Sequence, residues 1–256
     1  MKVVILAGGL GTRLAEETEV RPKPMVEIGE RPILWHIMKH YAFYGLKEFI
    51  IALGYKGEAI KHFFLEQTSL RGNLTIDMRT SQVTVEKETH EDWIVHLVDT
   101  GPDSQTGGRI ARVRDYLDND TFMLTYGDGV SNVDLSALLD FHNRAHRIVT
   151  LTAVRPPARF GGLVIDGDLI RQFTEKPQIG EGWINGGFMA MQPEILDYIT
   201  SDKTILETDV LDKLAAERQL AAYRHDDFWQ CMDTLRDKRQ LENLWQEGKA
   251  RWKTWA

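Results

Sequence analysis

Residues 3–14 read Val3-Val4-Ile5-Leu6-Ala7-Gly8-Gly9-Leu10-Gly11-Thr12-Arg13-Leu14, a short apolar run that breaks into three glycines within four residues. An apolar run of this length, rich in β-branched residues, indicates a buried strand. Glycines after such a strand let the backbone adopt positive φ and approach a ligand closely. Successive N–H groups can then turn toward an anion such as a phosphate. The stretch therefore predicts a strand and a phosphate-binding loop, with Arg13 as a fixed positive charge beside it.

Two familiar phosphate loops do not match this stretch. A dinucleotide-binding fingerprint that began at Gly9 would need a glycine at position 14, where the chain has Leu14. A P-loop that began at Gly8 would need Gly-Lys at positions 13 and 14. A plain strand-to-helix turn stays open as an alternative. The segment Arg21-Pro22-Lys23-Pro24-Met25 adds more positive charge on a backbone stiffened by proline.

Composition limits the class of protein. The chain has 256 residues, of which 43% are hydrophobic, and this is enough for one large domain over 1–256. Its formal net charge of -7 argues against a general nucleic-acid surface, so a local basic site suggests a small anionic ligand. A single cysteine, Cys231, allows no intrachain disulfide and fits a reducing cytoplasm. Because we find neither a secretory signal nor an apolar run near the roughly 20 residues of a membrane span, we expect a cytoplasmic protein with no membrane partner.

Buried strands alternate with amphipathic helices along the chain. This alternation predicts an α/β fold with a mostly parallel, doubly wound (Rossmann-like) sheet and helices on both faces. The predicted strands are 49–53, 93–99, 121–126 and 148–154, and the predicted helices are 32–41, 58–67, 207–217 and one that begins at Asp134.

Three further segments carry expectations of their own. Residues 68–93 are polar and alternate in places, and we expect an edge strand plus an excursion there. Residues 159–167 predict a small β-excursion with a turn at Asp166-Gly167. From about residue 234 a charged helical tail closes with Trp245, Trp252 and Trp255. These tryptophans belong either to the core or to a subunit interface.

Two aspartates are candidate metal ligands. Asp128 follows a buried strand between two glycines, and ligands of doubly wound sheets bind at the carboxyl ends of strands. Mg²⁺ takes one or two carboxylates together with phosphate oxygens, so Asp233 is the candidate second ligand. The alternatives are a turn aspartate at position 128 and a helix N-cap at position 233, next to Thr234.

The histidines and the single cysteine are weaker candidates for a metal site or a nucleophile. The pairs His36 with His40 and His142 with His146 have the i,i+4 spacing of zinc ligands but no obvious third ligand. We therefore predict ordinary helix-surface histidines. Cys231 is expected to be a small packed residue rather than a nucleophile.

Several short motifs occur in the order found in sugar-phosphate nucleotidyltransferases, and the chain resembles that family over nearly its whole length. The motifs are Gly-Gly-Leu-Gly-Thr-Arg (8–13), Pro-Lys-Pro-Met-Val (22–26), Tyr-Gly-Asp-Gly (126–129), Glu-Lys-Pro (175–177) and Asn-Gly-Gly-Phe (185–188). Within the family the chain is most similar to the cytidylyltransferase branch, in segments that include Thr-Gly-Gly-Arg (106–109) and 228–237.

The resemblance implies transfer of CMP from CTP to glucose 1-phosphate, with Mg²⁺ as cofactor, in a homo-oligomer that is a hexamer. The product, CDP-glucose, would lead to deoxysugars of surface polysaccharide. The implied catalytic residues are Arg13, Lys23 and Asp128, and the implied metal ligands are Asp128 and Asp233. The implied nucleotide site comprises Leu6, Ala7, Gly8, Gly9, Gly11, Thr12, Arg13, Lys23, Ser104, Arg109 and Gly127. The implied sugar-phosphate site comprises Tyr126, Glu175, Lys176, Asn185 and Gly186.

The chemistry of such a transfer fits these residue types. A phosphate nucleophile with a second pKa of about 6 is already anionic at neutral pH, so no general base is needed. The task is to neutralise two polyanions, which suits Arg13, Lys23 and Lys176; an exposed surface lysine stays the alternative for Lys176. A relative that uses dTTP or UTP and a catalytically silent regulatory subunit are the alternative functions. A silent subunit would be expected to lack Arg13, Lys23 or one of the two aspartates, and all of them are present.

Overall fold

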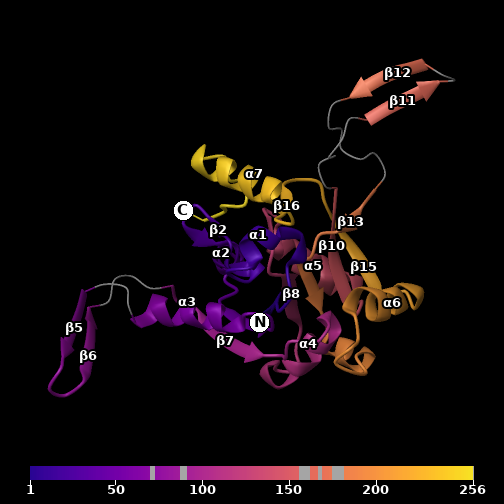
Figure 1. Cartoon of the computed structure of the whole chain (residues 1–256). Coiled ribbons are helices and arrows are strands. Elements are labelled where there is room, and N and C mark those ends of the chain that lie inside the picture. Colours follow the sequence, from indigo (N-terminus) through magenta and orange to yellow (C-terminus); the bar gives the residue numbers. More distant parts are fainter. Residues whose placement is uncertain (70–72, 87–90, 156–161, 167–168, 175–181, 256) are drawn as a thin grey trace.

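One central sheet organises the molecule (Figure 1). The computed structural model describes residues 1–69, 73–86, 91–155, 162–166, 169–174 and 182–255. Within them, eight strands form the sheet in the order β13-β10-β14-β8-β1-β4-β7, and β15 pairs with β10. The strands are β1 (Lys2–Ala7), β4 (Glu48–Leu53), β7 (Ile94–Asp99), β8 (Phe122–Tyr126), β10 (Val149–Val154), β13 (Ile184–Asn185), β14 (Met189–Met191) and β15 (Leu220–His225).

The strand directions confirm the mostly parallel prediction. Strand β1 is parallel to both β4 and β8, β4 is parallel to β7, and β10 is parallel to β15. Only the β14 and β13 pairings run antiparallel among the described strands of this sheet. The sheet is therefore mixed, with its long parallel half built from the strands that the apolar runs predict.

Helices cover both faces of the sheet, as expected for a doubly wound fold. Alternate residues of β1 point to opposite faces, so Val3, Ile5 and Ala7 join one apolar cluster while Val4 and Leu6 join another. Helices α2 (Ile33–Phe43), α3 (Gly57–Ser69), α5 (Leu135–Ala145) and α7 (Leu235–Gln246) contribute to the first cluster. Helices α4 (Thr106–Arg112) and α6 (Asp212–Ala216) contribute to the second.

Smaller elements fill the connections. They are the short helices η1 (Thr12–Leu14), α1 (Ala15–Thr18), η2 (Lys23–Met25), η3 (Arg114–Tyr116) and η4 (Pro193–Tyr198), and the strand pairs β2 (Glu27–Ile28) with β3 (Arg31–Pro32) and β9 (Gly129–Ser131) with β16 (Trp229–Cys231). The predicted helix over 207–217 differs in its first half, where η5 (Leu206–Leu211) is π-helical before α6 begins. No helix in the described part of the chain is both long and apolar enough to cross a membrane.

Two hairpins extend away from the sheet in Figure 1. The edge strand expected within 68–93 is wrong, because among the described strands β5 (Asn73–Asp77) and β6 (Gln82–Glu86) pair with each other and not with the central sheet. Ile76 and Val83 lie opposite each other on this hairpin and stay 54% and 56% exposed, so the hairpin does not bury these side chains against the sheet. Strands β11 (Gly162–Asp166) and β12 (Leu169–Thr174) confirm the predicted β-excursion; Gly167 of its predicted turn lies outside the described residues.

The tail tryptophans pack inside this chain. Trp252 is fully buried and stacks on Phe228, with ring centroids 5.5 Å apart. Its indole N–H donates to Nδ1 of His36 at 3.4 Å, and Nε2 of His36 donates to the Ile28 carbonyl at 2.8 Å. The interface alternative is therefore wrong for Trp252, which belongs to the core. Burial lowers the pKa of His36 to about 4, so its ring is neutral.

The prediction of surface histidines is wrong for three of the four residues. His36, His40 and His142 are buried, and only His146 of the two pairs is exposed. Each buried ring has a partner inside the fold: Nδ1 of His40 contacts Oγ1 of Thr254 at 3.1 Å, and Nδ1 of His142 contacts Oγ1 of Thr150 at 2.8 Å. Among the described residues no three potential ligands come together as a zinc site.

Candidate active site

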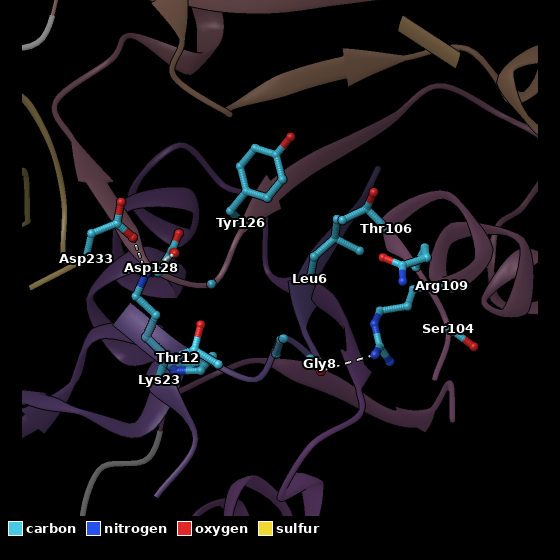
Figure 2. Close-up of a pocket in the computed structure, with 16 residues that line it drawn as sticks. Leu6, Gly8, Thr12, Lys23, Ser104, Thr106, Arg109, Tyr126, Asp128 and Asp233 are labelled. Carbon is cyan, nitrogen blue, oxygen red and sulfur yellow. Dashed lines mark hydrogen bonds and ion pairs between the residues drawn. The ribbon is translucent and has the colours of Figure 1, made fainter. Parts of the chain in front are cut away.

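A cavity of about 330 Å³ opens at the carboxyl ends of β1 and β8 (Figure 2). It gathers the following predicted site residues: Leu6, Ala7, Gly8, Gly9, Gly11, Thr12, Lys23, Ser104, Arg109, Tyr126, Gly127, Asp128 and Asp233. Its wall also includes Pro24, Gln105 and Thr106, for which the sequence analysis assigned no role. The geometry thus brings the candidate residues together; the ligand that each of them binds stays a prediction.

The remaining candidates lie around the cavity or beyond the described residues. Glu175 and Lys176 fall outside the described residues. The backbone of Arg13 lies in η1 beside the cavity, and its side chain is not described. Asn185 reaches the cavity wall, because its Nδ2 donates to the Tyr126 hydroxyl at 3.2 Å. Gly186 follows Asn185, and its carbonyl accepts a hydrogen bond from Nε1 of Trp229 at 2.7 Å.

A three-residue strand pair brings the two aspartates together. Strand β9 directly follows Asp128, and it pairs antiparallel with β16 so that Gly129 lies opposite Cys231. The N–H of Met232 donates to the carbonyl of Asp128 at 2.9 Å and extends the ladder. Asp233 is the next residue, so the two carboxylates meet although they are far apart in sequence. Neither strand has a periodic pattern long enough to predict this pairing.

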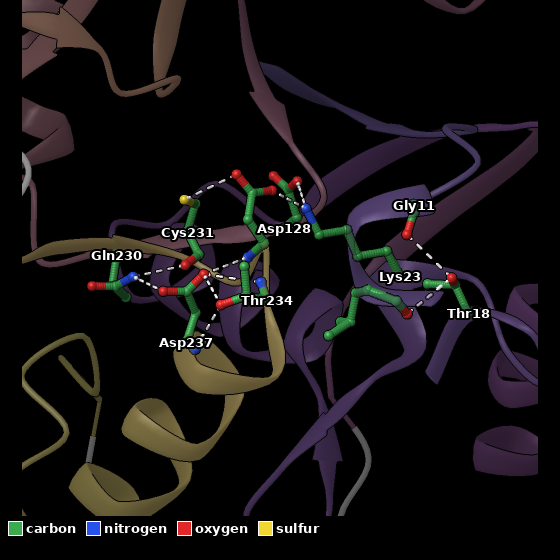
Figure 3. A network of polar contacts seen from close by, with 10 residues as sticks. Gly11, Thr18, Lys23, Asp128, Gln230, Cys231, Thr234 and Asp237 are labelled. Atoms are coloured by element: carbon green, nitrogen blue, oxygen red, sulfur yellow. Dashed lines mark hydrogen bonds and ion pairs between the residues drawn. The ribbon is translucent and has the colours of Figure 1, made fainter. Parts of the chain in front are cut away.

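Asp233 does not cap the last helix. Thr234 is the N-cap of α7, and its Oγ1 accepts from the N–H of Asp237 at 3.2 Å (Figure 3). Oδ2 of Asp237 accepts in return from the N–H groups of Thr234 and Asp233 at 2.9 and 3.1 Å, which completes a capping box. The N-cap alternative for Asp233 is therefore wrong, and its carboxylate is directed at Lys23 instead.

Lys23 lies between the two carboxylates (Figures 2 and 3). Its Nζ donates to Oδ2 of Asp128 at 2.6 Å and to Oδ1 of Asp233 at 2.5 Å. Burial disfavours the charged amine, but the Asp128 and Asp233 carboxylates outweigh it, so the pKa of Lys23 is raised above its ordinary value. The site therefore holds a cation where its two anionic groups converge.

The same two carboxylates fit a divalent metal ion. They are hard oxygen donors that converge where Nζ of Lys23 lies, and Mg²⁺ binds through one or two carboxylates plus substrate phosphates, so a metal ion bound between them would displace the lysine amine from that point. Cys231 is no competing ligand or nucleophile: burial, with the nearby aspartates, raises the pKa of its thiol to about 12.

Arg109 joins the ends of three parallel strands. Arg109 is 5% exposed, and its guanidinium donates to carbonyl oxygens of Gly8, Leu53 and Gly101 at 3.1, 3.1 and 2.8 Å. It also donates to Oγ1 of Thr100 at 2.7 Å. Burial lowers its pKa from the ordinary value, although arginine stays charged in proteins. Arg109 therefore connects the glycine loop to the loop after β7, which carries Ser104.

The glycines of the loop serve different purposes. A Cβ added to Gly8 would lie 2.3 Å from Cζ of Arg109, so Gly8 leaves room for the guanidinium rather than for a ligand. Gly9 has nothing within 4 Å of the same position and faces open space. Gly11 has φ of +66°, and its carbonyl accepts from the N–H of Leu14 at 3.0 Å where η1 begins. The sequence analysis expected both a positive φ and a close approach to the backbone, and the structure shows the first at Gly11 and the second, by the Arg109 side chain, at Gly8.

The cavity combines a glycine loop after the first strand with two convergent carboxylates and a lysine that lies between them. The chain belongs to the nucleotidyl transferase family, whose model matches residues 2–246. This confirms the family resemblance of the motifs, and members of the family generally use a divalent metal ion.

Particular relatives are similar over the full length. The glucose-1-phosphate cytidylyltransferases of Salmonella typhi and of Salmonella typhimurium strain LT2 are each 52% identical over 256 residues, covering all of both chains. Among solved structures, HddC from Yersinia pseudotuberculosis complexed with GMP-PN superposes with a TM-score of 0.69 at 24% identity, over 95% of this chain and 99% of that one.

Proposed function

We propose that this chain transfers the CMP group of CTP to α-D-glucose 1-phosphate, forming CDP-glucose and pyrophosphate. The full-length similarity to two glucose-1-phosphate cytidylyltransferases supports the choice of substrates. The observation that carries the mechanism is the convergence of Asp128, Asp233 and Lys23 beside the glycine loop. The homo-oligomer and the cytoplasmic location expected from the sequence stay predictions.

The reaction is an in-line displacement at phosphorus. A phosphate oxygen of glucose 1-phosphate forms a bond to the α-phosphorus of CTP, and the bond from that phosphorus to the bridging oxygen breaks to release pyrophosphate. The nucleophile is already anionic, with a second pKa of about 6, so no base is needed. The described residues that line the cavity accordingly include no histidine. Catalysis then consists of positioning and charge neutralisation.

The residues of the cavity divide this work. Lys23 supplies a positive charge that its aspartate partners keep protonated, and the loop 8–12 presents backbone N–H groups to phosphate oxygens. Asp128 and Asp233 would hold Mg²⁺, which supplies neutralisation of the α-phosphate and of the departing pyrophosphate. Arg109 holds the loop after β7 against the glycine loop, so the walls of the nucleotide end keep their spacing.

The first experiment is pyrophosphate release with Mg²⁺ and glucose 1-phosphate, with CTP, dTTP, UTP and ATP compared side by side. Release with CTP as the preferred nucleotide is the expected result. Preference for dTTP or UTP would overturn the cytidylyl assignment within the same family. No release with any nucleotide would favour the catalytically silent subunit, and equilibrium binding of CTP would then measure whether the site still holds nucleotide.

A further inference from the structure

Glu207 accepts hydrogen bonds from two residues of the cavity wall. Its Oε2 accepts a hydrogen bond from Oγ1 of Thr106 at 2.7 Å, and its Oε1 accepts one from the Tyr126 hydroxyl at 2.6 Å. Thr106 and Tyr126 both line the cavity (Figure 2), whereas Glu207 is not among its lining residues. Glu207 is in the first turn of the π-helical segment η5, a type of irregular turn that often occurs at functional sites.

The backbone determines where the proton of Tyr126 points. The N–H of Gly187 donates to Oδ1 of Asn185 at 2.9 Å, which fixes the orientation of that amide. The Nδ2 group of Asn185 therefore donates to the Tyr126 oxygen at 3.2 Å, and the phenol must accept on that side. Its own proton goes to the carboxylate of Glu207, because a carboxylate accepts hydrogen bonds only. Burial, with the Glu207 charge, raises the pKa of Tyr126 and keeps it a neutral phenol.

The same reasoning applies to Thr106. The backbone N–H of Leu206 donates to Oγ1 of Thr106 at 2.8 Å, so this hydroxyl accepts on that side. Its proton then goes to the other oxygen of the Glu207 carboxylate. A hydroxyl has one donor and two acceptor lone pairs, so each of these two hydroxyls has its proton engaged with Glu207 and one lone pair that these hydrogen bonds do not use.

We propose that Glu207 is a positioning residue that makes Thr106 and Tyr126 pure hydrogen-bond acceptors toward the substrates. Such a wall binds hydroxyl groups, which donate, and disfavours phosphate oxygens, which only accept. This inference rests on the proposed function, in which the groups that the wall selects are the hydroxyls of the ribose and of the acceptor sugar. Tyr126 lies beside Asn185 and Asp128, whereas Thr106 is close to Ser104 and Arg109 in sequence, so one carboxylate serves both ends of the cavity.

The test is Glu207→Gln, which keeps the shape of the side chain. A neutral amide has one acceptor oxygen and one N–H₂ group, so one of the two hydroxyls must turn its proton into the cavity. We expect kcat/KM to fall about tenfold to a hundredfold, chiefly through KM, because a polar group without a matching partner is costly where water is partly excluded. Glu217→Gln is the matched control, because Glu217 accepts from the Tyr198 hydroxyl at the same 2.6 Å on the exposed surface.

Deoxy substrates separate this role from a merely structural one. Each enzyme is assayed with glucose 1-phosphate and its 2-, 3-, 4- and 6-deoxy analogues, and with CTP and its 2′- and 3′-deoxy analogues. For at least one analogue, the loss of kcat/KM caused by the missing hydroxyl should be at least about fivefold smaller in Glu207→Gln than in the wild-type enzyme. Equal costs for every analogue in both enzymes, or kinetics like those of Glu217→Gln, would overturn the proposal.

Two further variants keep the test valid if Glu207→Gln melts early. Tyr126→Phe and Thr106→Val each remove one hydroxyl from the wall. In each variant, one class of deoxy analogue should no longer lower kcat/KM relative to the normal substrate. If the analogues lower kcat/KM equally in both variants and in the wild type, the proposal is again contradicted. An error in the proposed substrates is distinguishable, because the wild-type enzyme itself would then show little turnover with CTP and glucose 1-phosphate. In that case the same ratios are measured with the nucleotide and sugar phosphate that the wild type prefers.

Discussion

Gly8→Ala should destabilise the protein far more than Gly9→Ala, although the two glycines are adjacent. A Cβ at position 8 would lie 2.3 Å from Cζ of Arg109 and 2.4 Å from its Nη1, whereas ordinary contacts begin near 3.4 Å. The guanidinium would have to move by roughly 1 Å. On another side the guanidinium already packs closely against Gly54, where an added Cβ would lie 2.4 Å from Nη1. Position 9 has no atom within 4 Å of an added Cβ.

The magnitude follows from the hydrogen bonds that such a shift breaks. Arg109 donates to acceptors on the ends of β1, β4 and β7, and hydrogen bonds to a charged group are worth about 1.5–3 kcal/mol each. Loss of two of them lowers the free energy of unfolding by about 3–6 kcal/mol. At about 2–4 °C of Tm per kcal/mol for a chain of this size, we expect Tm to fall by roughly 6–24 °C. Gly9→Ala should stay within about 0.5 kcal/mol of the wild type.

The assay is urea unfolding followed by tryptophan fluorescence, with thermal melts as a second measure. A double-mutant cycle with Arg109→Ala isolates the cause, because Gly8→Ala should add little once the guanidinium is gone. Equal Tm values for Gly8→Ala and Gly9→Ala would refute this account of Gly8. An undiminished effect of Gly8→Ala in the Arg109→Ala background would show that another contact is responsible.

Three other predictions concern the metal site and the core. Asp128→Asn and Asp233→Asn should each lower kcat at least about 100-fold while circular dichroism stays unchanged, because one charged ligand is lost; near-normal turnover would remove that residue from the metal site. His36 and His40 have pKa values lowered to about 4, below the ordinary 6.5, so the unfolded state takes up protons first as the pH falls. The contribution of these two neutral histidines to stability is therefore complete above about pH 6.5 and is lost progressively as the pH falls toward 4. His36→Gln should make the free energy of unfolding, measured with urea, depend less steeply on pH over that range; an unchanged dependence would contradict the assignment. Trp252→Ala should cost about 3–5 kcal/mol in urea unfolding because its side chain is fully buried, and a cost below 1 kcal/mol would place the tail outside the core.

The sequence predicts the parts of this fold whose signals are local. Strands β1, β4 and β8 are continuous apolar runs that end in glycine or polar residues, and helix α2 begins after a proline with an apolar face. The glycine loop and Asp128 follow two of these strands directly, so their place at one edge of the sheet follows from the parallel arrangement.

Features that depend on distant partners could not be predicted in this way. The burial of His36 depends on Trp252, which is 216 residues away in sequence. The role of Gly8 depends on a guanidinium from position 109, and that of Glu207 on hydroxyls at positions 106 and 126. A polar residue in a helical pattern looks the same whether it faces solvent or a buried partner, so the periodicity could not identify His36 or Glu207. Gly8 lies in a loop, where no periodicity applies.

The pairing of β9 with β16 also has a consequence for how the chain matures during synthesis. Lys23 and Asp128 emerge from the ribosome well before Asp233, and the strand that carries Asp233 into place comes from the last part of the chain. A domain generally folds as a unit. Because Leu241 and Trp252 belong to the first apolar cluster, the core and the pair of convergent carboxylates are completed together when the C-terminal segment docks. A chain released before β16 would therefore lack both Asp233 and part of its core.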